Sequence, residues 1–215
     1  MRWRELADLP FVAALTPQDG PLAAGGDYDS AHFDQVSFDA PRAPDSKFLE
    51  CAFTRVSVQG GQLRRARFTD VWLRDVRLAG TGLAETTWVD STFTGSVVAG
   101  VEAFGSQLRR VVLHDCKLDS VNFRDAVLTE VTFDNCVLRD VDFTGATLTQ
   151  TSFPRSRLTA TDFTGVTLDR LDLRGAELGI TIDPGSLRGA IVTTAQLADM
   201  AALFAESLGI MVADD

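Results

Sequence analysis

Three cysteines and two histidines are the side chains of this chain best suited to metal binding or nucleophilic chemistry. Cys51, Cys116 and Cys136 include no CxxC pair, and His32 and His114 form no histidine cluster. Structural zinc sites and similar centres need ligands at short, recurring spacings. The sequence therefore predicts no bound metal and no cofactor.

Catalytic motifs are also missing from the sequence. It contains no glycine-rich phosphate loop, no GxSxG and no HExxH. The segment DFTG, at 142–145 and 162–165, is unlike the DFG of kinases, which requires a lysine strand and a catalytic loop around it. We expect a protein that is not an enzyme.

Acidic and amide side chains recur at intervals of twenty residues, and their chemistry is the attraction of cationic groups. Glu102, Asn122, Asp142 and Asp162 form this series. Glu85 and Asp125 follow it in a neighbouring series, with Arg124 as the opposing charge. If the fold repeats every twenty residues, these carboxylates lie on one side of the molecule.

A five-residue repeat dominates the elements that must position these groups. Every fifth residue from Phe33 to Leu178 is Phe, Leu, Val or Trp, apart from Ala43 and Ala103, and a small residue usually stands two positions earlier. Neither the helical period of 3.6 nor the strand period of 2 produces such a pattern. The chain must turn a corner every five residues.

A coil of four short sides sends the bulky residue and the small residue inward. Stacking of such coils at the inter-strand spacing gives a rod roughly 36 Å long. All three cysteines occupy the small inward position and are expected in the core. Cys116 and Cys136 should stack one coil apart, close enough in principle for a disulfide, although a cytosolic setting argues against one.

At this point the sequence resembles the pentapeptide repeat family over about residues 31 to 180. VNFRD (121–125), VDFTG (141–145) and TDFTG (161–165) match its A(D/N)LXX consensus well, as do LDLRG (171–175) and AELGI (176–180). The resemblance implies an all-β fold, a right-handed quadrilateral parallel β-helix. In most pentads of this chain Asp or Asn is replaced at the position before the centre.

Length and charge indicate one soluble chain in three parts. We expect an N-terminal cap segment at 1–30, a β-helix at 31–180 and a C-terminal module at 181–215. The formal charge of −10 is concentrated outside the repeats, which contribute only −3. No apolar stretch is long enough for a membrane span, and acidic residues interrupt the short apolar run near the start. A cytoplasmic protein that does not bind membranes is expected.

An apolar patch is a second candidate contact. Residues 91–105 hold one charge, Ala103 lacks a bulky side chain, and Phe104 beside it faces outward by its phase. Trp72 should also face outward. Exposed aromatic residues mark interface cores, although Phe104 could instead swing inward to replace Ala103.

The C-terminal segment carries a helix signature. Thr193 and Gln196 form a capping box, and the helix should run to about Leu208 before Gly209, with residues 209–212 as a short strand. This helix could merely seal the core. The segment also looks like the C-terminal module of quinolone-resistance relatives, which implies a homodimer. The candidate dimerisation residues are Leu197, Met200, Leu203, Phe204, Leu208 and Met211.

The functional hypothesis comes from this resemblance. Some dimeric family members without inserted loops bind DNA gyrase as duplex mimics and inhibit it or shield it from quinolones. The implied role is a DNA-mimicking modulator of gyrase, a topoisomerase inhibitor or quinolone-resistance factor that binds no nucleic acid directly. The alternative is a protein-protein interaction scaffold with an unidentified cytoplasmic partner. A third possibility is an immunity factor against a self-made topoisomerase toxin.

Overall fold

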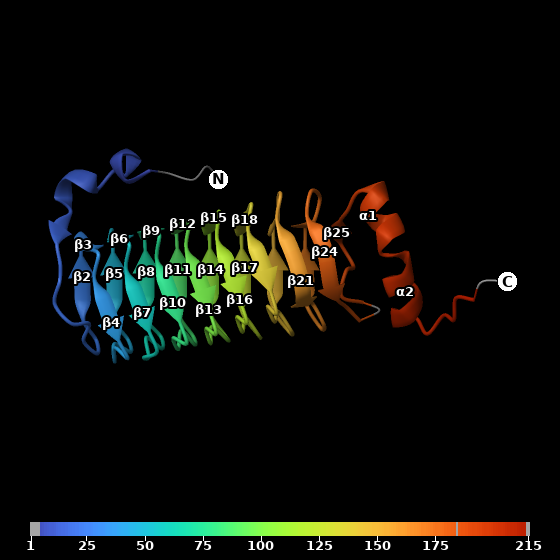
Figure 1. Cartoon of the computed structure of the whole chain (residues 1–215), viewed down its shortest axis with the longest axis horizontal. Coiled ribbons are helices and arrows are strands. Elements are labelled where there is room, and N and C mark those ends of the chain that lie inside the picture. Colours follow the sequence, from blue (N-terminus) through green and yellow to red (C-terminus); the bar gives the residue numbers. More distant parts are fainter. Residues whose placement is uncertain (1–4, 184, 214–215) are drawn as a thin grey trace.

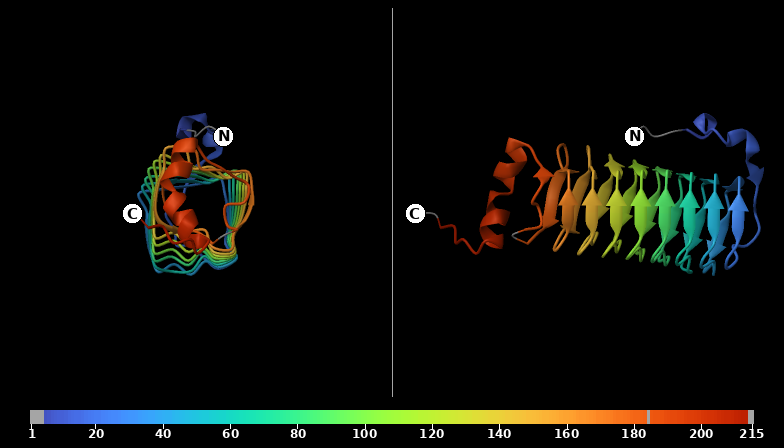
Figure 2. Two further views of the ribbon diagram at one scale, coloured as in Figure 1. Left: turned by 90° about the vertical axis from the view of Figure 1, so that its right-hand side faces the viewer. Right: turned by 180° about the vertical axis from the view of Figure 1, so that it is seen from behind.

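The chain winds into a rod of stacked, four-sided coils (Figure 1). The computed structural model describes residues 5–183 and 185–213. It is a right-handed parallel β-solenoid of about eight coils with short helices at its C-terminal end. Seen along the axis, the coils superpose in a quadrilateral outline (Figure 2). The predicted β-helix is confirmed.

Three of the four sides are parallel sheets, and within the repeats each strand pairs with the strand about twenty residues away. Sheet A contains β1 (Thr16–Pro17), β3 (Ala31–Asp34), β6 (Ala52–Thr54), β9 (Trp72–Arg74), β12 (Thr92–Thr94), β15 (Val112–His114) and β18 (Thr132–Asp134). Sheet B contains β4 (Ser37–Asp39), β7 (Ser57–Gln59), β10 (Arg77–Ala79), β13 (Val97–Ala99), β16 (Lys117–Asp119), β19 (Val137–Arg139), β21 (Arg157–Asp162) and β24 (Glu177–Thr181). Sheet C contains β2 (Asp27–Asp29), β5 (Lys47–Leu49), β8 (Arg67–Thr69), β11 (Thr87–Val89), β14 (Gln107–Arg109), β17 (Val127–Thr129), β20 (Thr147–Thr149) and β22 (Thr167–Asp169).

The fourth side, which we call face D, is a ladder of single-residue bridges opposite sheet A. One residue per coil, from Ala23 to Asp162, forms a parallel β-bridge with the equivalent residue of the next coil. A short two-stranded sheet of β23 (Leu171–Asp172) and β25 (Ala190–Ile191) continues the line of sheet A at the C-terminal end. The twenty-residue periodicity of the sequence is therefore the period of the coil.

Each corner is made by a residue in the left-handed backbone region. Every fifth residue from Ser30 to Gly175 has a positive φ, between 43° at Ala40 and 78° at Gly175. Non-glycine residues adopt this region at a cost of about 1 kcal/mol each, and Gly, Asp and Asn are enriched at these positions. This pattern was present in the sequence, but the prediction used only the apolar residues.

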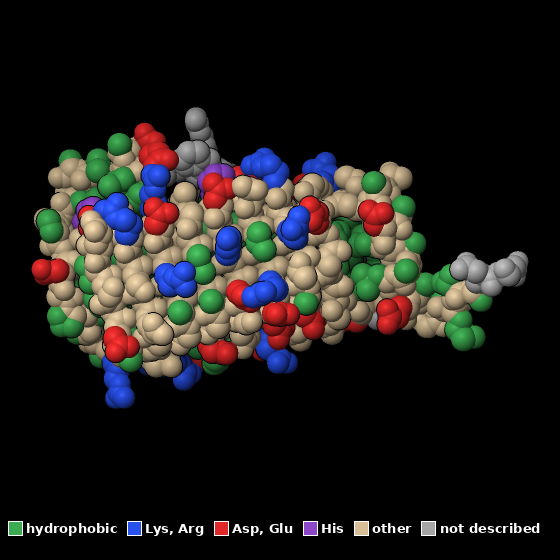
Figure 3. Space-filling model, in the orientation of Figure 1, with side chains coloured by type: hydrophobic (Ala, Val, Ile, Leu, Met, Phe, Trp, Pro, Cys, Tyr) green, Lys and Arg blue, Asp and Glu red, His purple; other side chains and the backbone are tan. Residues whose placement is uncertain are grey.

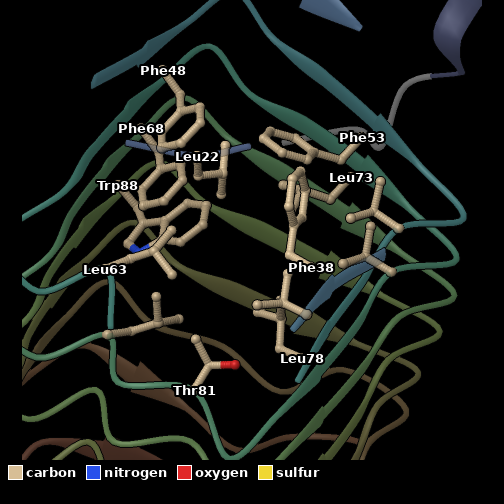
Figure 4. A pocket seen from close by; sticks show the side chains of 14 residues that line it. Leu22, Phe38, Phe48, Phe53, Leu63, Phe68, Leu73, Leu78, Thr81 and Trp88 are labelled. Carbon is tan, nitrogen blue, oxygen red and sulfur yellow. The ribbon is translucent and has the colours of Figure 1, made fainter. Parts of the chain in front are cut away.

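The core is a column of stacked side chains that faces inward from all four sides. Phe48, Phe68 and Trp88 stack in successive coils of sheet C, with ring centroids 4.8 and 3.7 Å apart (Figure 4). The indole Nε1 of Trp88 donates a hydrogen bond to Thr86 Oγ1 at 3.1 Å. Burial of such rings against their own repeats holds successive coils together.

The N-terminal segment folds back along the outside of sheet A (Figure 1). It contains two short 3-10 helices, η1 (Leu6–Asp8) and η2 (Val12–Ala14), and strand β1, which pairs with β3. Leu9 and Phe11 are buried, while Val12 is exposed. Leu9 and Phe11 pack on the side of the rod, in one cluster with Ala52 and Trp72 of sheet A.

The C-terminal helix is split into α1 (Thr194–Asp199) and α2 (Ala201–Ser207), which meet at Met200. The predicted capping box is confirmed, since Thr193 Oγ1 accepts the amide of Gln196 at 3.1 Å. The short strand expected at 209–212 is wrong, because the structure describes no strand there. None of the helices in the described ranges is long and apolar enough to cross a membrane.

Candidate functional site

The acidic series predicted from the sequence forms a straight column on face D. Glu102, Asn122, Asp142 and Asp162 are joined by successive parallel bridges, one per coil. The Nδ2 of Asn122 donates to Glu102 Oε2 at 2.7 Å. The structure thus brings these side chains into one row along the rod axis.

Two of the carboxylates are fixed by the backbone. Asp142 Oδ1 accepts the amide of Thr144, and Asp162 Oδ1 accepts the amide of Thr164, both at 2.8 Å. These bonds stabilise the corner and also hold each carboxylate in one orientation. Arg124 Nε lies 3.7 Å from Asp142 Oδ2 and partly neutralises it.

The neighbouring acidic column lies at the corner between face D and sheet C. The carboxylate of Asp125 lies close to Gly145. A Cβ atom added to Gly145 would be only 2.6 Å from Asp125 Oδ1. Glu85 forms an ion pair with Arg64. The carboxylates of this side without an ion-pair partner among the described residues are therefore Glu102, Asp125 and Asp162.

Face D is polarised along the rod. Its N-terminal half carries Arg42, Arg64 and Arg65, and its C-terminal half carries the acidic columns. Arg65 donates to both oxygens of Asp45, at 2.7 and 2.8 Å, and this bidentate hydrogen bond lowers the pKa of the carboxyl group. The acidic side is confined to the part of the rod after residue 81.

The predicted apolar patch is divided between opposite sides. Phe104 is 40% exposed on face D, whereas Ala103 points into the core and is buried. Phe104 therefore does not replace the missing core side chain, and a cavity of about 40 Å³ lies beside Ala103.

The expected exposure of Trp72 is wrong. It lies on the outer surface of sheet A but is only 2% exposed, because the N-terminal segment covers it.

The three cysteines lie in the core, as expected. Burial raises the pKa of the Cys51 thiol to about 11. A hydrogen bond with Cys116, together with burial, raises the pKa of Cys136. Reactive cysteines have depressed pKa values and partial exposure, so these two thiols have the character of core residues.

His114 is less isolated than the sequence suggested. Its Nδ1 lies 3.1 Å from Asp134 Oδ2, and its Nε2 lies 3.1 Å from Asp115 Oδ2. Asp134 also pairs with Arg155. The twenty-residue spacing of 114 and 134 was the signal that could have predicted this contact.

The C-terminal module divides its apolar residues between two surfaces. Met200 is buried against the end of the core, and Leu203 and Phe204 pack on the same cluster. Met200 is therefore unavailable to a partner, contrary to its predicted place in a dimer contact. Leu197, Leu208 and Met211 are 52, 63 and 95% exposed. Hydrophobic side chains gather at this end of the rod (Figure 3).

Gln196 ties α1 to the last coil. Its Nε2 donates to the carbonyl oxygens of Leu173 and Ala176, at 2.7 and 2.8 Å. Without such donors, the carbonyls at the end of a solenoid would lack partners. The helix therefore also caps the backbone of the rod.

Comparison with models of known protein families finds one family that is similar to part of the rod. The family model described as a pentapeptide repeat region matches residues 86–163 and 106–182. The two matches overlap and together span residues 86–182, so this part of the rod is similar to pentapeptide repeats.

Several solved structures are similar to this chain at low identity. A trypsin-treated variant of QnrB1, a plasmid-mediated fluoroquinolone resistance protein, is 17% identical, with a TM-score of 0.48, over 88% of this chain and 100% of that one. Full-length QnrB1 is 16% identical, with a TM-score of 0.38, over 86% and 100%. HetL, from the cyanobacterium Nostoc and involved in heterocyst differentiation regulation, is 17% identical, with a TM-score of 0.31, over 81% and 84%. Comparison with curated proteins gave no match.

Proposed function

We propose that this chain is a non-enzymatic, protein-binding rod of the cytoplasm whose acidic side imitates the phosphate row of a DNA duplex. The observation that carries the proposal is the straight column of Glu102, Asp142 and Asp162, one position per coil on face D. Fixed carboxylates in a row attract a basic groove at long range. DNA gyrase is the proposed partner, following the family resemblance of the sequence.

The charge density of the column sets the expected strength of binding. Successive coils are about 4.8 Å apart, whereas duplex DNA carries one charge per about 1.7 Å of its axis. The column alone therefore has less than half the linear charge of a duplex. We expect gyrase to use further contacts beside the column, with Phe104 as the nearest exposed apolar side chain on the same face.

The test is a gyrase supercoiling assay titrated with the purified protein, with and without a fluoroquinolone, at two salt concentrations. The informative variant combines Asp142→Asn and Asp162→Asn. Asparagine keeps an oxygen for the amides of Thr144 and Thr164 but removes both charges. The matched control is Asp172→Asn, because Asp172 accepts the amide of Arg174 in the same way but lies on β23, in line with sheet A.

We expect inhibition or drug protection by the unmodified protein to weaken with salt and with the double substitution, and to survive in the control. If gyrase responds equally to the unmodified protein and the double variant, the acidic column is not the binding site. If gyrase shows no response at tens of micromolar protein, it is not the partner.

A protein-protein interaction scaffold is the second candidate function, and the exposure of Phe104 favours it. Phe104 lies on face D next to Ala103, and it is 40% exposed. Binding through this side chain would be lost in Phe104→Ala and would change little with salt. The two candidates thus differ in salt dependence and in the substitution that removes binding.

We also propose that the C-terminal module forms a homodimer. Leu197, Leu208 and Met211 present apolar surface beyond the end of the rod, together with Ile210 and Val212. Exposed apolar side chains in one region are typical of a contact surface. Burial of a two-fold contact at this end would leave face D of both copies open to partners.

A further inference from the structure

The N-terminal end of the rod has an open strand edge in sheet B. On sheet A, β1 adds a strand beside β3, with Thr16 opposite Ala31 and Pro17 opposite His32. On sheet B, β4 is the last strand, and no described strand pairs with its outer edge. At this end of the rod, the edge of sheet A is therefore paired with β1, whereas the edge of sheet B is unpaired.

The unused backbone groups of β4 can be identified from the next coil. The amide of Ser57 donates to Val36 at 3.0 Å, and the carbonyl of Gln59 accepts from Ala40 at 2.7 Å. The amide of the first residue and the carbonyl of the third residue of a sheet B strand thus point toward the N-terminal end of the rod. Their equivalents in β4 are the amide of Ser37 and the carbonyl of Asp39, and no described residue bonds to either of them. An unpaired edge of this kind accepts another strand.

A hollow of about 360 Å³ lies beside this edge. Its apolar wall includes Leu22, Val36 and Phe38. Val36 is half-buried, whereas Val56, its equivalent one coil on, is 1% exposed. The first coil therefore leaves Val36 partly uncovered at the open edge, beside the buried Leu22 and Phe38.

The charges of the hollow define what fits it. Asp19 and Asp39 line it and are exposed, and none of its lining residues is Lys or Arg. A cationic side chain placed between these carboxylates would be stabilised by both of them. An acidic segment would be repelled by the same two carboxylates.

We propose that β4 binds an extended basic peptide segment of a partner protein as an additional strand. Backbone hydrogen bonds form with Ser37 and Asp39, an apolar side chain covers Val36 and Phe38, and a Lys or Arg lies between Asp19 and Asp39. This is strand addition to a sheet edge, and β1 on sheet A is an example of it within this chain. The site is remote from the acidic column and does not depend on the function proposed above.

The test uses the full chain and a fluorescein-labelled heptapeptide of alternating valine and lysine, acetylated and amidated at its ends. Fluorescence anisotropy measures its affinity, which we expect in the tens of micromolar because the edge is only three residues long. A peptide with N-methylated backbone and a peptide with glutamate in place of lysine should each bind about ten-fold more weakly or worse, a loss of about 1.4 kcal/mol.

Variants of the protein locate the site. Asp19→Asn combined with Asp39→Asn should weaken binding about ten-fold, whereas Asp29→Asn, on the edge strand of sheet C outside the hollow, should not. Ser37→Pro should abolish binding, because proline is tolerated on an edge strand but removes the amide donor. Circular dichroism confirms that each variant is folded.

Three results would overturn the proposal. One is equal affinity for the N-methylated or the glutamate peptide, and another is an equal loss of binding in Asp29→Asn. The third is concentration-dependent self-association, measured by sedimentation velocity, that Ser37→Pro removes. That result would show that a second copy occupies the edge.

Discussion

Phe11 covers Trp72. The two side chains belong to one apolar cluster with Leu9 and Ala52, separate from the core of the rod, and each is 6% exposed or less. The ion pair between Glu5 and Arg74 joins the same segment to sheet A. Trp72 points away from the coil, but it is buried by the N-terminal segment, which lies some sixty residues earlier in the sequence.

Replacement of Phe11 by alanine should expose Trp72 and lower the free energy of unfolding by about 3 kcal/mol, the usual cost of truncating a buried phenylalanine. Tryptophan fluorescence should shift to the red and become accessible to acrylamide. The control is Val12→Ala on the adjacent, exposed side chain, with an expected change below about 0.5 kcal/mol. Equal effects of the two substitutions would show that the segment does not cover Trp72.

Substitution of Ala103 by valine should stabilise the protein by about 1 kcal/mol, because the added methyl groups fill the cavity beside this residue. The control is Ala126→Val. Ala126 is fully buried and does not line that cavity, so overpacking should cost about 2 kcal/mol. Thermal unfolding of both variants measures the difference. Destabilisation by Ala103→Val would mean that the cavity closes around alanine in solution.

The C-terminal cap should weaken in acid through Asp183. The amides of Gly185 and Gly165 donate to its carboxylate at 2.8 and 2.7 Å and hold its pKa below the usual value of 3.8. Because the folded pKa is the lower one, the stabilisation is present above pH 3.8 and is lost as the pH falls through the folded value.

Denaturant unfolding from neutral pH to about pH 2.5 measures this contribution. Asp183→Asn should be less stable than the unmodified chain at neutral pH, and the difference should shrink in acid. Asp199→Asn, an exposed acid on α1, is the matched control. A difference that does not change with pH would assign the effect of Asp183 to something other than its charge.

The proposed dimer should depend on the exposed apolar residues and not on those that seal the core. Leu208→Ser together with Met211→Ser should convert a dimer to a monomer without a loss of thermal stability in the rod, since both side chains are more than 60% exposed. Met200→Ser should instead destabilise the end of the core. Sedimentation velocity reports the first effect and thermal unfolding the second. A dimer that persists in the double variant would place the contact elsewhere.

Most of the rod could be predicted from the spacing of its apolar residues. The phase from Phe33 to Leu178 determines which side chains point inward, and the interval of twenty brings Glu102, Asp142 and Asp162 together because neighbouring coils pair in register. These are local consequences of a repeated sequence.

Two of the failures involve contacts outside the repeat. The burial of Trp72 depends on the path of the N-terminal segment, which no periodicity encodes. The helix is interrupted at Met200, which is buried against the end of the core, and tertiary packing of this kind overrides local propensity. The contact between His114 and Asp134 lies within the repeat, and the interval of twenty residues between them could have predicted it.

The positive φ at every fifth residue has a consequence for insertions and deletions. A deletion of twenty residues removes one whole coil and leaves each later residue on its side of the rod. A deletion of five between Glu102 and Asp142 removes one corner, so every later residue moves to the adjacent side, and Asp142 and Asp162 leave the column of Glu102. The length of this protein can therefore change in steps of one coil, while smaller steps rearrange its surface without disturbing the phase of its core.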